Sequence, residues 1–176
     1  APEGRPASPD PKLVNAFTAL YRDHYARLVA FAHRRLGTAD QAEDCVAEVF
    51  RIAWEVARRT QDPATVLSSG WLFAATRNVI AHQWRSAGRA VELARAYAVE
   101  LDRQTQSDCP EGCHQSLLDA LAELPADQRE LLIARYWDGL TASEAGCLLG
   151  ISPGAARVRT HRARAALKRL LPTPKE

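Results

Sequence analysis

The chain of 176 residues contains no methionine, only three lysines among its 23 basic residues, and no long apolar run. A membrane-spanning helix needs about 20 consecutive apolar residues, so we expect no membrane insertion. No secretory signal pattern is present, which favours a cytoplasmic location. Because methionine is missing even at position 1, we expect the native chain to begin elsewhere.

Cysteine is also scarce: the chain has four cysteines. This number is too small for a disulfide scaffold in a chain of this length. Cys45 and Cys147 lie in apolar helical patterns, which predicts small buried core residues. Cys109, Cys113 and His114 lie close together and form either the start of a metal or redox site or part of a linker with incidental thiols. No fourth ligand is obvious nearby, so we expect neither a metal nor a cofactor.

Acidic residues are absent from two windows, although the net charge of +2 suggests nothing unusual. Residues 63–91 contain three arginines and no acid, and residues 145–175 contain seven basic residues and no acid. By contrast, residues 39–56 carry five acids and one base. One such run is usually a solvated face, but two on predicted helices favour nucleic-acid binding.

The hydrophobic pattern predicts an all-α protein of two small helical domains joined by a flexible linker, because no run alternates with the period of a strand. Proline-rich residues 1–11 and residues 173–176 are expected to be disordered tails, and acidic residues 90–114 to be the linker. A loop is expected over residues 60–70. The expected helices cover approximately residues 12–36, 39–57, 71–87, 114–124, 125–137, 141–149 and 153–171.

The last two helices have the signals of a helix-turn-helix. Thr141 and Glu144 form a capping-box pattern, Gly150 suits the turn, and Ser152 followed by Pro153 suits the start of a helix. A basic second helix after a tight turn is typical of a unit that enters the major groove.

The last helix divides into an inward and an outward face. Residues of the outward face near its N-terminal half suit base edges and thymine methyl groups, although a merely solvated basic helix is the alternative. The inward stripe comprises Ala156, Thr160, Ala163, Leu167 and Leu170, and the outward residues are Arg157, Val158, His161 and Arg162.

Several motifs resemble a known family. Residues 124–130, 139–144, 149–152 and 162–164 resemble region 4 of sigma-70-family factors, a domain that is similar to the output domain of response regulators. Residues 17–36 resemble region 2.1, residues 42–50 followed by Trp54 resemble region 2.2, and residues 71–78 with 84–85 resemble regions 2.3 to 2.4. The order and spacing are similar to those of the extracytoplasmic-function (ECF) group.

The resemblance implies region 2 at residues 12–89 and region 4 at residues 115–172. It implies a non-enzymatic subunit that directs RNA polymerase to promoters through the −35 and −10 elements and initiates transcription by strand opening. The implied partners are core polymerase, through its β′ clamp helices and β flap, promoter DNA and an anti-sigma factor. The alternative is a dimeric helix-turn-helix regulator with an N-terminal sensor or dimerisation domain.

The resemblance also implies three binding surfaces. Asp44, Glu48 and Arg51 would bind core polymerase, unless they form a merely solvated acidic face. The outward face of the last helix would read the −35 element. The −10 element would meet a stripe of residues on the helix expected over residues 71–87 and just beyond it: Trp71, Asn78, His82, Arg85 and Arg89. Trp71, and likewise Trp84 outside this stripe, is either a core residue or a DNA contact.

Overall fold

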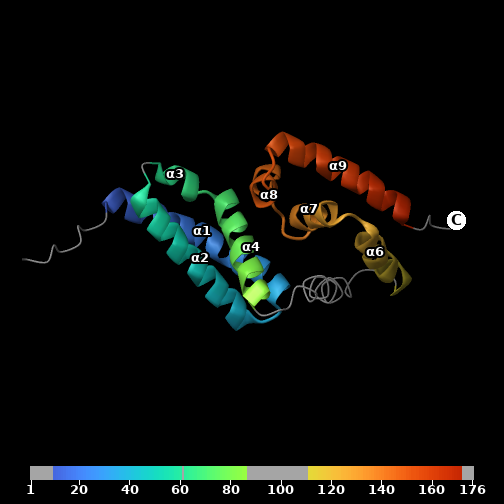
Figure 1. The fold of residues 1–176 in the computed structure, drawn as a ribbon, viewed down its shortest axis with the longest axis horizontal. Coiled ribbons are helices and arrows are strands. Elements are labelled where there is room, and N and C mark those ends of the chain that lie inside the picture. Colours follow the sequence, from blue (N-terminus) through green and yellow to red (C-terminus); the bar gives the residue numbers. More distant parts are fainter. Residues whose placement is uncertain (1–9, 61, 87–110, 172–176) are drawn as a thin grey trace, which may run out of the picture.

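A computed structural model describes residues 10–60, 62–86 and 111–171, and within these ranges every regular element is a helix. Figure 1 shows an N-terminal half, residues 10–86, and a C-terminal half, residues 111–171. The all-α prediction is confirmed. No described helix has both the length and the apolar character to cross a membrane. The helices are α1 (Pro11–Leu36), α2 (Ala39–Arg59), α3 (Pro63–Val66), α4 (Ser69–Ser86), α6 (Glu111–Glu123), α7 (Ala126–Tyr136), α8 (Ala142–Leu149) and α9 (Pro153–Leu170).

The N-terminal half is a bundle in which α1, α2 and α4 pack against one another. The stripe predicted for α2 faces its core, because Val46, Val49 and Ala53 are fully buried. Phe31 of α1 meets Phe73 of α4 edge to face, with ring centroids 5.3 Å apart. Burial of these apolar surfaces is the main stabilising contribution to the bundle.

Local capping fixes where α1 begins and ends. The backbone N–H of Lys12 donates to Asp10 Oδ1 at 2.9 Å, and Pro11 occupies the first turn. Gly37 ends the helix with a φ of 83°. Asp10 and Pro11 therefore belong to the helix start rather than to the predicted tail; residues 1–9 and 172–176 lie outside the described residues.

Two predicted boundaries differ in the structure. The expected loop over residues 60–70 contains the short helix α3, and α4 begins within it at Ser69. Pro63 opens α3, and the Thr65 hydroxyl donates to Asp62 Oδ2 at 2.8 Å. Helix α6 begins at Glu111, inside the predicted linker, whose residues 90–110 lie outside the described part of the chain.

The C-terminal half has a small core of its own. Leu121 of α6, Leu124 of the connection after it and Leu132 of α7 pack with Ala163 of α9. Two predictions on this half are wrong. Cys147 is exposed rather than buried, and Leu170, the last residue of α9 and of the predicted inward stripe, is also exposed. Cys45, in contrast, is fully buried as predicted.

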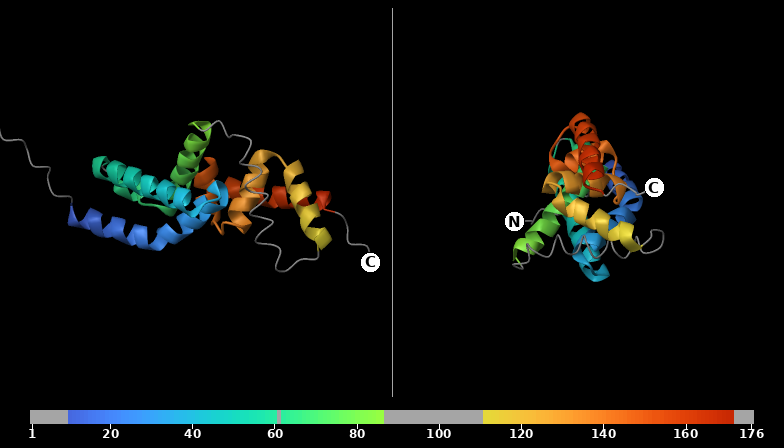
Figure 2. Two further views of the ribbon diagram at one scale, coloured as in Figure 1. Left: turned by 90° about the horizontal axis from the view of Figure 1, so that it is seen from below. Right: turned by 90° about the vertical axis from the view of Figure 1, so that its right-hand side faces the viewer.

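The two halves pack directly against each other, chiefly through α4 and α8 (Figure 2). Leu131, Leu140 and Leu148 of the C-terminal half belong to the same buried cluster as Phe31 and Phe73. The sequence suggested two separate domains, and this shared core was not expected.

Candidate nucleic-acid interface

The helix-turn-helix is held by the predicted caps. Glu144 N–H donates to Thr141 Oγ1 at 3.2 Å, and Thr141 N–H donates to Glu144 Oε2 at 2.7 Å, which completes a capping box. Gly150 takes the left-handed conformation, φ 66°, that glycine adopts without strain. The Ala155 N–H then donates to Ser152 Oγ at 3.1 Å and starts α9. These contacts fix the direction in which α9 leaves the turn.

Helix α9 presents one buried face and one exposed face. Ala156, Thr160 and Ala163 are buried, and the Thr160 hydroxyl donates to the Ala156 carbonyl at 2.7 Å, so its polar group is satisfied. Val158 keeps 51% of its surface exposed. The structure brings together, exposed on the N-terminal half of one helix, all the residues predicted to read the −35 element: Arg157, Val158, His161 and Arg162.

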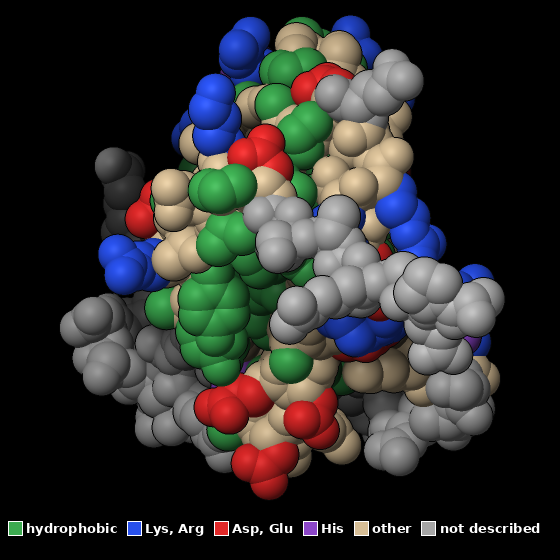
Figure 3. Space-filling model, turned by 90° about the vertical axis from the view of Figure 1, so that its left-hand side faces the viewer, with side chains coloured by type: hydrophobic (Ala, Val, Ile, Leu, Met, Phe, Trp, Pro, Cys, Tyr) green, Lys and Arg blue, Asp and Glu red, His purple; other side chains and the backbone are tan. Residues whose placement is uncertain are grey.

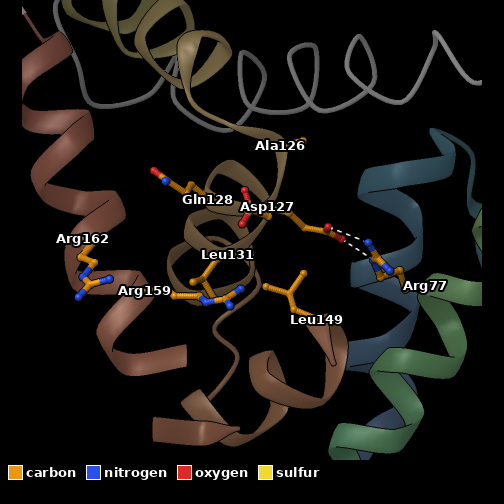
Figure 4. A pocket seen from close by; sticks show the side chains of 9 residues that line it. Arg77, Ala126, Asp127, Gln128, Leu131, Leu149, Arg159 and Arg162 are labelled. Carbon is orange, nitrogen blue, oxygen red and sulfur yellow. Dashed lines mark hydrogen bonds and ion pairs between the residues drawn. The ribbon is translucent and has the colours of Figure 1, made fainter. Parts of the chain in front are cut away.

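Arg162 and Arg159 also line a cleft of about 520 Å³ where α7, α8 and α9 meet α4. Figure 4 shows them on one side of this cleft, with Arg77 of α4 on the other side. Arg77 donates to both carboxylate oxygens of Glu130, at 2.6 and 2.9 Å. The basic face of α9 therefore borders a cleft at the junction between the two halves, and Asp127 and Glu130 also line this cleft.

Helix α4 carries the stripe predicted to meet the −10 element. Asn78, His82 and Arg85 are exposed along it, while Arg89 lies outside the described residues. Trp71 and Trp84 are half-buried and pack against the core of the N-terminal half. Each ring therefore has a packing role in the N-terminal half.

The acidic face of α2 is partly neutralised by its own arginine. Arg51 pairs with Glu48 and Glu55, each at 2.6 Å, and Asp44 is exposed one turn earlier. The hydrogen bond from Arg51 holds the pKa of Glu48 below its usual value, and the same contact raises the pKa of Arg51. These four side chains leave a net negative surface with Arg51 held in a fixed place.

An aromatic cluster that the sequence patterns did not predict lies beside this acidic face. The ring of Tyr21 lies 4.8 Å from Phe50 and 5.0 Å from Tyr25, and Phe17 lies 5.0 Å from Trp54. Tyr21 is 42% exposed. Figure 3 shows hydrophobic side chains exposed on this side of the molecule, with acidic side chains gathered below them. The four-residue spacing of Phe17, Tyr21 and Tyr25 was the available signal.

Comparisons with known proteins agree with this arrangement. The family model for Sigma-70 region 2 matches residues 20–90, and that for Sigma-70, region 4, matches residues 114–167. The chain is 35% identical over 155 residues to the ECF RNA polymerase sigma factor SigL of Mycobacterium tuberculosis, covering 85% of each chain. This chain belongs to the ECF sigma factors. Its sigma-factor regions coincide with the two halves of the structure.

Two further similarities extend over nearly the whole sigma factor. It is 33% identical over 162 residues to the RNA polymerase sigma factor CarQ of Myxococcus xanthus, covering 89% of this chain and 90% of CarQ. A solved structure of CnrH in complex with the cytosolic domain of CnrY superposes with a TM-score of 0.54 at 26% identity. That match covers 90% of this chain and 93% of CnrH. The alternative of a dimeric regulator with an N-terminal sensor domain is not favoured.

Proposed function

We propose that this sigma factor directs core RNA polymerase to promoters by reading the −35 element with α9. The observation that carries the proposal is the exposed, acid-free first half of α9, held out from a capped helix-turn-helix. Arg157 and Arg162 suit bidentate pairing with guanine, and Val158 suits a thymine methyl group. Arg164 lies over the Tyr136 ring at 5.7 Å and suits a phosphate-facing role.

The −10 element is assigned to α4. Asn78 offers an amide for a base edge, and His82 and Arg85 offer cationic or hydrogen-bonding groups on the same exposed stripe. The exposed part of Trp71 provides a surface on which a separated base can stack. By stabilising the separated strands, these groups would promote opening of the DNA duplex. Arg89 would extend the stripe.

Core polymerase is assigned to α2 and the neighbouring aromatic cluster. Asp44, Glu48 and Arg51 present charges of both signs in a fixed pattern, which suits recognition of the β′ clamp helices. The exposed Tyr21 adds an apolar contact of the kind enriched at interfaces. Region 4 would contact the β flap.

The remaining assignments concern partners and boundaries. The CnrH complex with the cytosolic domain of CnrY supports an anti-sigma partner for this chain as well. The matches to regions 2 and 4 support a division into residues 12–89 and 115–172. We assign the chain a regulatory role in the cytoplasm, without catalytic activity.

The −35 assignment is tested with substitutions on α9. Arg157→Ala and Arg162→Ala should each cost about 1–3 kcal/mol on the matching −35 sequence and relax discrimination at one base position. Arg169→Ala, in the last turn of α9, is the matched control and should weaken binding equally on all sequences. Polymerase-dependent initiation on promoters with single −35 changes measures both. Equal losses on every sequence for Arg157 and Arg162 would contradict base reading.

A further inference from the structure

The cleft bordered by α7 and α9 has the size and the mixed lining of a small-molecule site. Its volume of about 520 Å³ lies within the usual range for such sites. Leu131, which is buried, and Leu149, which is half-buried, are among the residues that line it. Figure 4 shows Arg159 extending from α9 toward these two leucines. The cleft therefore places charged groups beside an apolar surface, as a site for an amphipathic ligand requires.

The charged groups of the cleft are only partly balanced by one another. Arg77 donates to both carboxylate oxygens of Glu130, so these two side chains neutralise each other. Arg159, Arg162 and Asp127 line the same cleft. None of these three side chains has a hydrogen-bond or ion-pair partner among the residues that the structure describes. The cleft thus offers two guanidinium groups and one carboxylate to a ligand.

The two unpaired guanidinium groups suit a ligand that carries phosphate. Arg159 and Arg162 are three residues apart on α9, which places them on the same side of the helix. No acid occurs in residues 145–175 to neutralise them within α9. Each guanidinium can donate two parallel hydrogen bonds to a phosphoryl group. A diphosphate therefore matches this pair, because each of its phosphoryl groups meets one arginine.

The carboxylate of Asp127 indicates what the rest of the ligand presents. An ionised carboxylate only accepts hydrogen bonds, and it does so through two oxygens. The edge of a guanine base carries two neighbouring N–H donors, on N1 and on the amino group of C2, which match these two oxygens. An adenine edge instead places a ring-nitrogen lone pair beside its amino group, and a carboxylate repels that lone pair. Bases are commonly read in this way while an apolar side chain covers the ring.

We infer that this cleft binds a guanine nucleoside diphosphate. Arg159 and Arg162 hold the phosphates, and Asp127 accepts hydrogen bonds from the edge of the base. Leu131 and Leu149 pack against the ring. This ligand site goes beyond promoter recognition and does not rest on the proposed −35 and −10 contacts. Binding is measured with the free chain, without polymerase or DNA, so its outcome is separate from that of the proposed function.

Isothermal titration calorimetry of the full chain with GDP, ADP and inorganic pyrophosphate tests the site. GDP should bind at a single site and about tenfold more tightly than either of the others, because only GDP satisfies both the arginines and the carboxylate. No binding of GDP at millimolar concentration overturns the inference. Equal binding of GDP and pyrophosphate also overturns it, since the cleft would then hold an anion alone. Equal binding of GDP and ADP overturns the assignment to guanine.

Two substitutions show whether the nucleotide lies in this cleft. Arg159→Ala should weaken GDP binding about tenfold, because a charge-assisted hydrogen bond to a phosphate is lost. Asp127→Asn should remove most of the preference for GDP over ADP, because an amide presents a donor as well as an acceptor. The matched controls Arg169→Ala and Glu123→Gln change exposed residues that do not line the cleft and should have neither effect. Equal losses for Arg159→Ala and Arg169→Ala would place the nucleotide elsewhere and overturn the inference.

The four substituted side chains are all exposed, so each variant should keep the fold of the wild-type chain. Thermal unfolding followed by circular dichroism checks this. The comparison of GDP, ADP and pyrophosphate uses the wild-type chain alone and decides the inference even where a variant is unstable.

Discussion

Asp138 combines near-complete burial with two arginine partners that are more than 100 positions away in the sequence. Two guanidinium groups around one carboxylate satisfy its lone pairs, which offsets the cost of removing the charge from water. Loss of the carboxylate leaves Arg35 buried beside a neutral group. Asp138 therefore contributes more to the free energy of unfolding than an exposed ion pair such as Arg51 with Glu55.

Asp138→Asn should lower the free energy of unfolding by about 3 kcal/mol, because a buried guanidinium loses its counter-charge. Asp23→Asn, which removes an exposed carboxylate of α1, is the matched control and should change stability by less than about 0.5 kcal/mol. Urea unfolding followed by circular dichroism measures both. Equal unfolding midpoints for the two variants would refute the role of Asp138.

Glu144 gives the stability of the chain a defined pH dependence. Burial pushes the pKa of this carboxyl up, but hydrogen bonds from Thr141, Arg27 and Ser69 hold it below its ordinary value of 4.5. A lowered folded-state pKa means that the contribution is present above about pH 4.5 and is lost as the pH falls through the folded value. Glu144→Gln should therefore flatten the decline of the melting temperature below pH 4.5. An unchanged decline would show that Glu144 does not titrate in this way.

At the scale of elements, the helix-turn-helix depends on two N-caps and one left-handed glycine. Ser152→Ala should cost about 1 kcal/mol, because the Ala155 N–H loses its acceptor at the start of α9. The matched control is Ser143→Ala, an exposed serine inside α8 whose replacement favours the helix. Chemical denaturation measures the difference. A control that loses as much stability as Ser152→Ala would contradict the capping role.

The elements also show how far the sequence could predict the structure. Helix α2 was predictable, because its apolar residues repeat with helical spacing and are buried on one face. Helix α3 was missed, since four residues are too few to show a period. Cys147 was wrongly placed in the core, because helical spacing within α8 does not distinguish the buried Leu148 face from the side that meets Gly70.

At the scale of the whole molecule, the sequence shows which segments are acidic and which lack acids. It does not show that the two halves pack together. The acid-free windows lie on α4 and α9 and the acidic stretch lies on α2, as predicted. The joining of the halves was not predictable, because Arg34 and Asp138 each resemble an ordinary surface residue until the fold places them 2.6 Å apart. Ion pairs such as Arg34 with Asp138 and Arg27 with Glu144 hold together the two halves that the sequence suggested were independent.

Run-off transcription on a promoter library, with purified core polymerase in the presence and absence of this chain, tests the central claim most directly. We predict chain-dependent transcripts from promoters that share paired −35 and −10 sequences at fixed spacing. Loss of either sequence should abolish the transcript. No chain-dependent initiation from any promoter would contradict the assignment of α9 and α4 to promoter recognition.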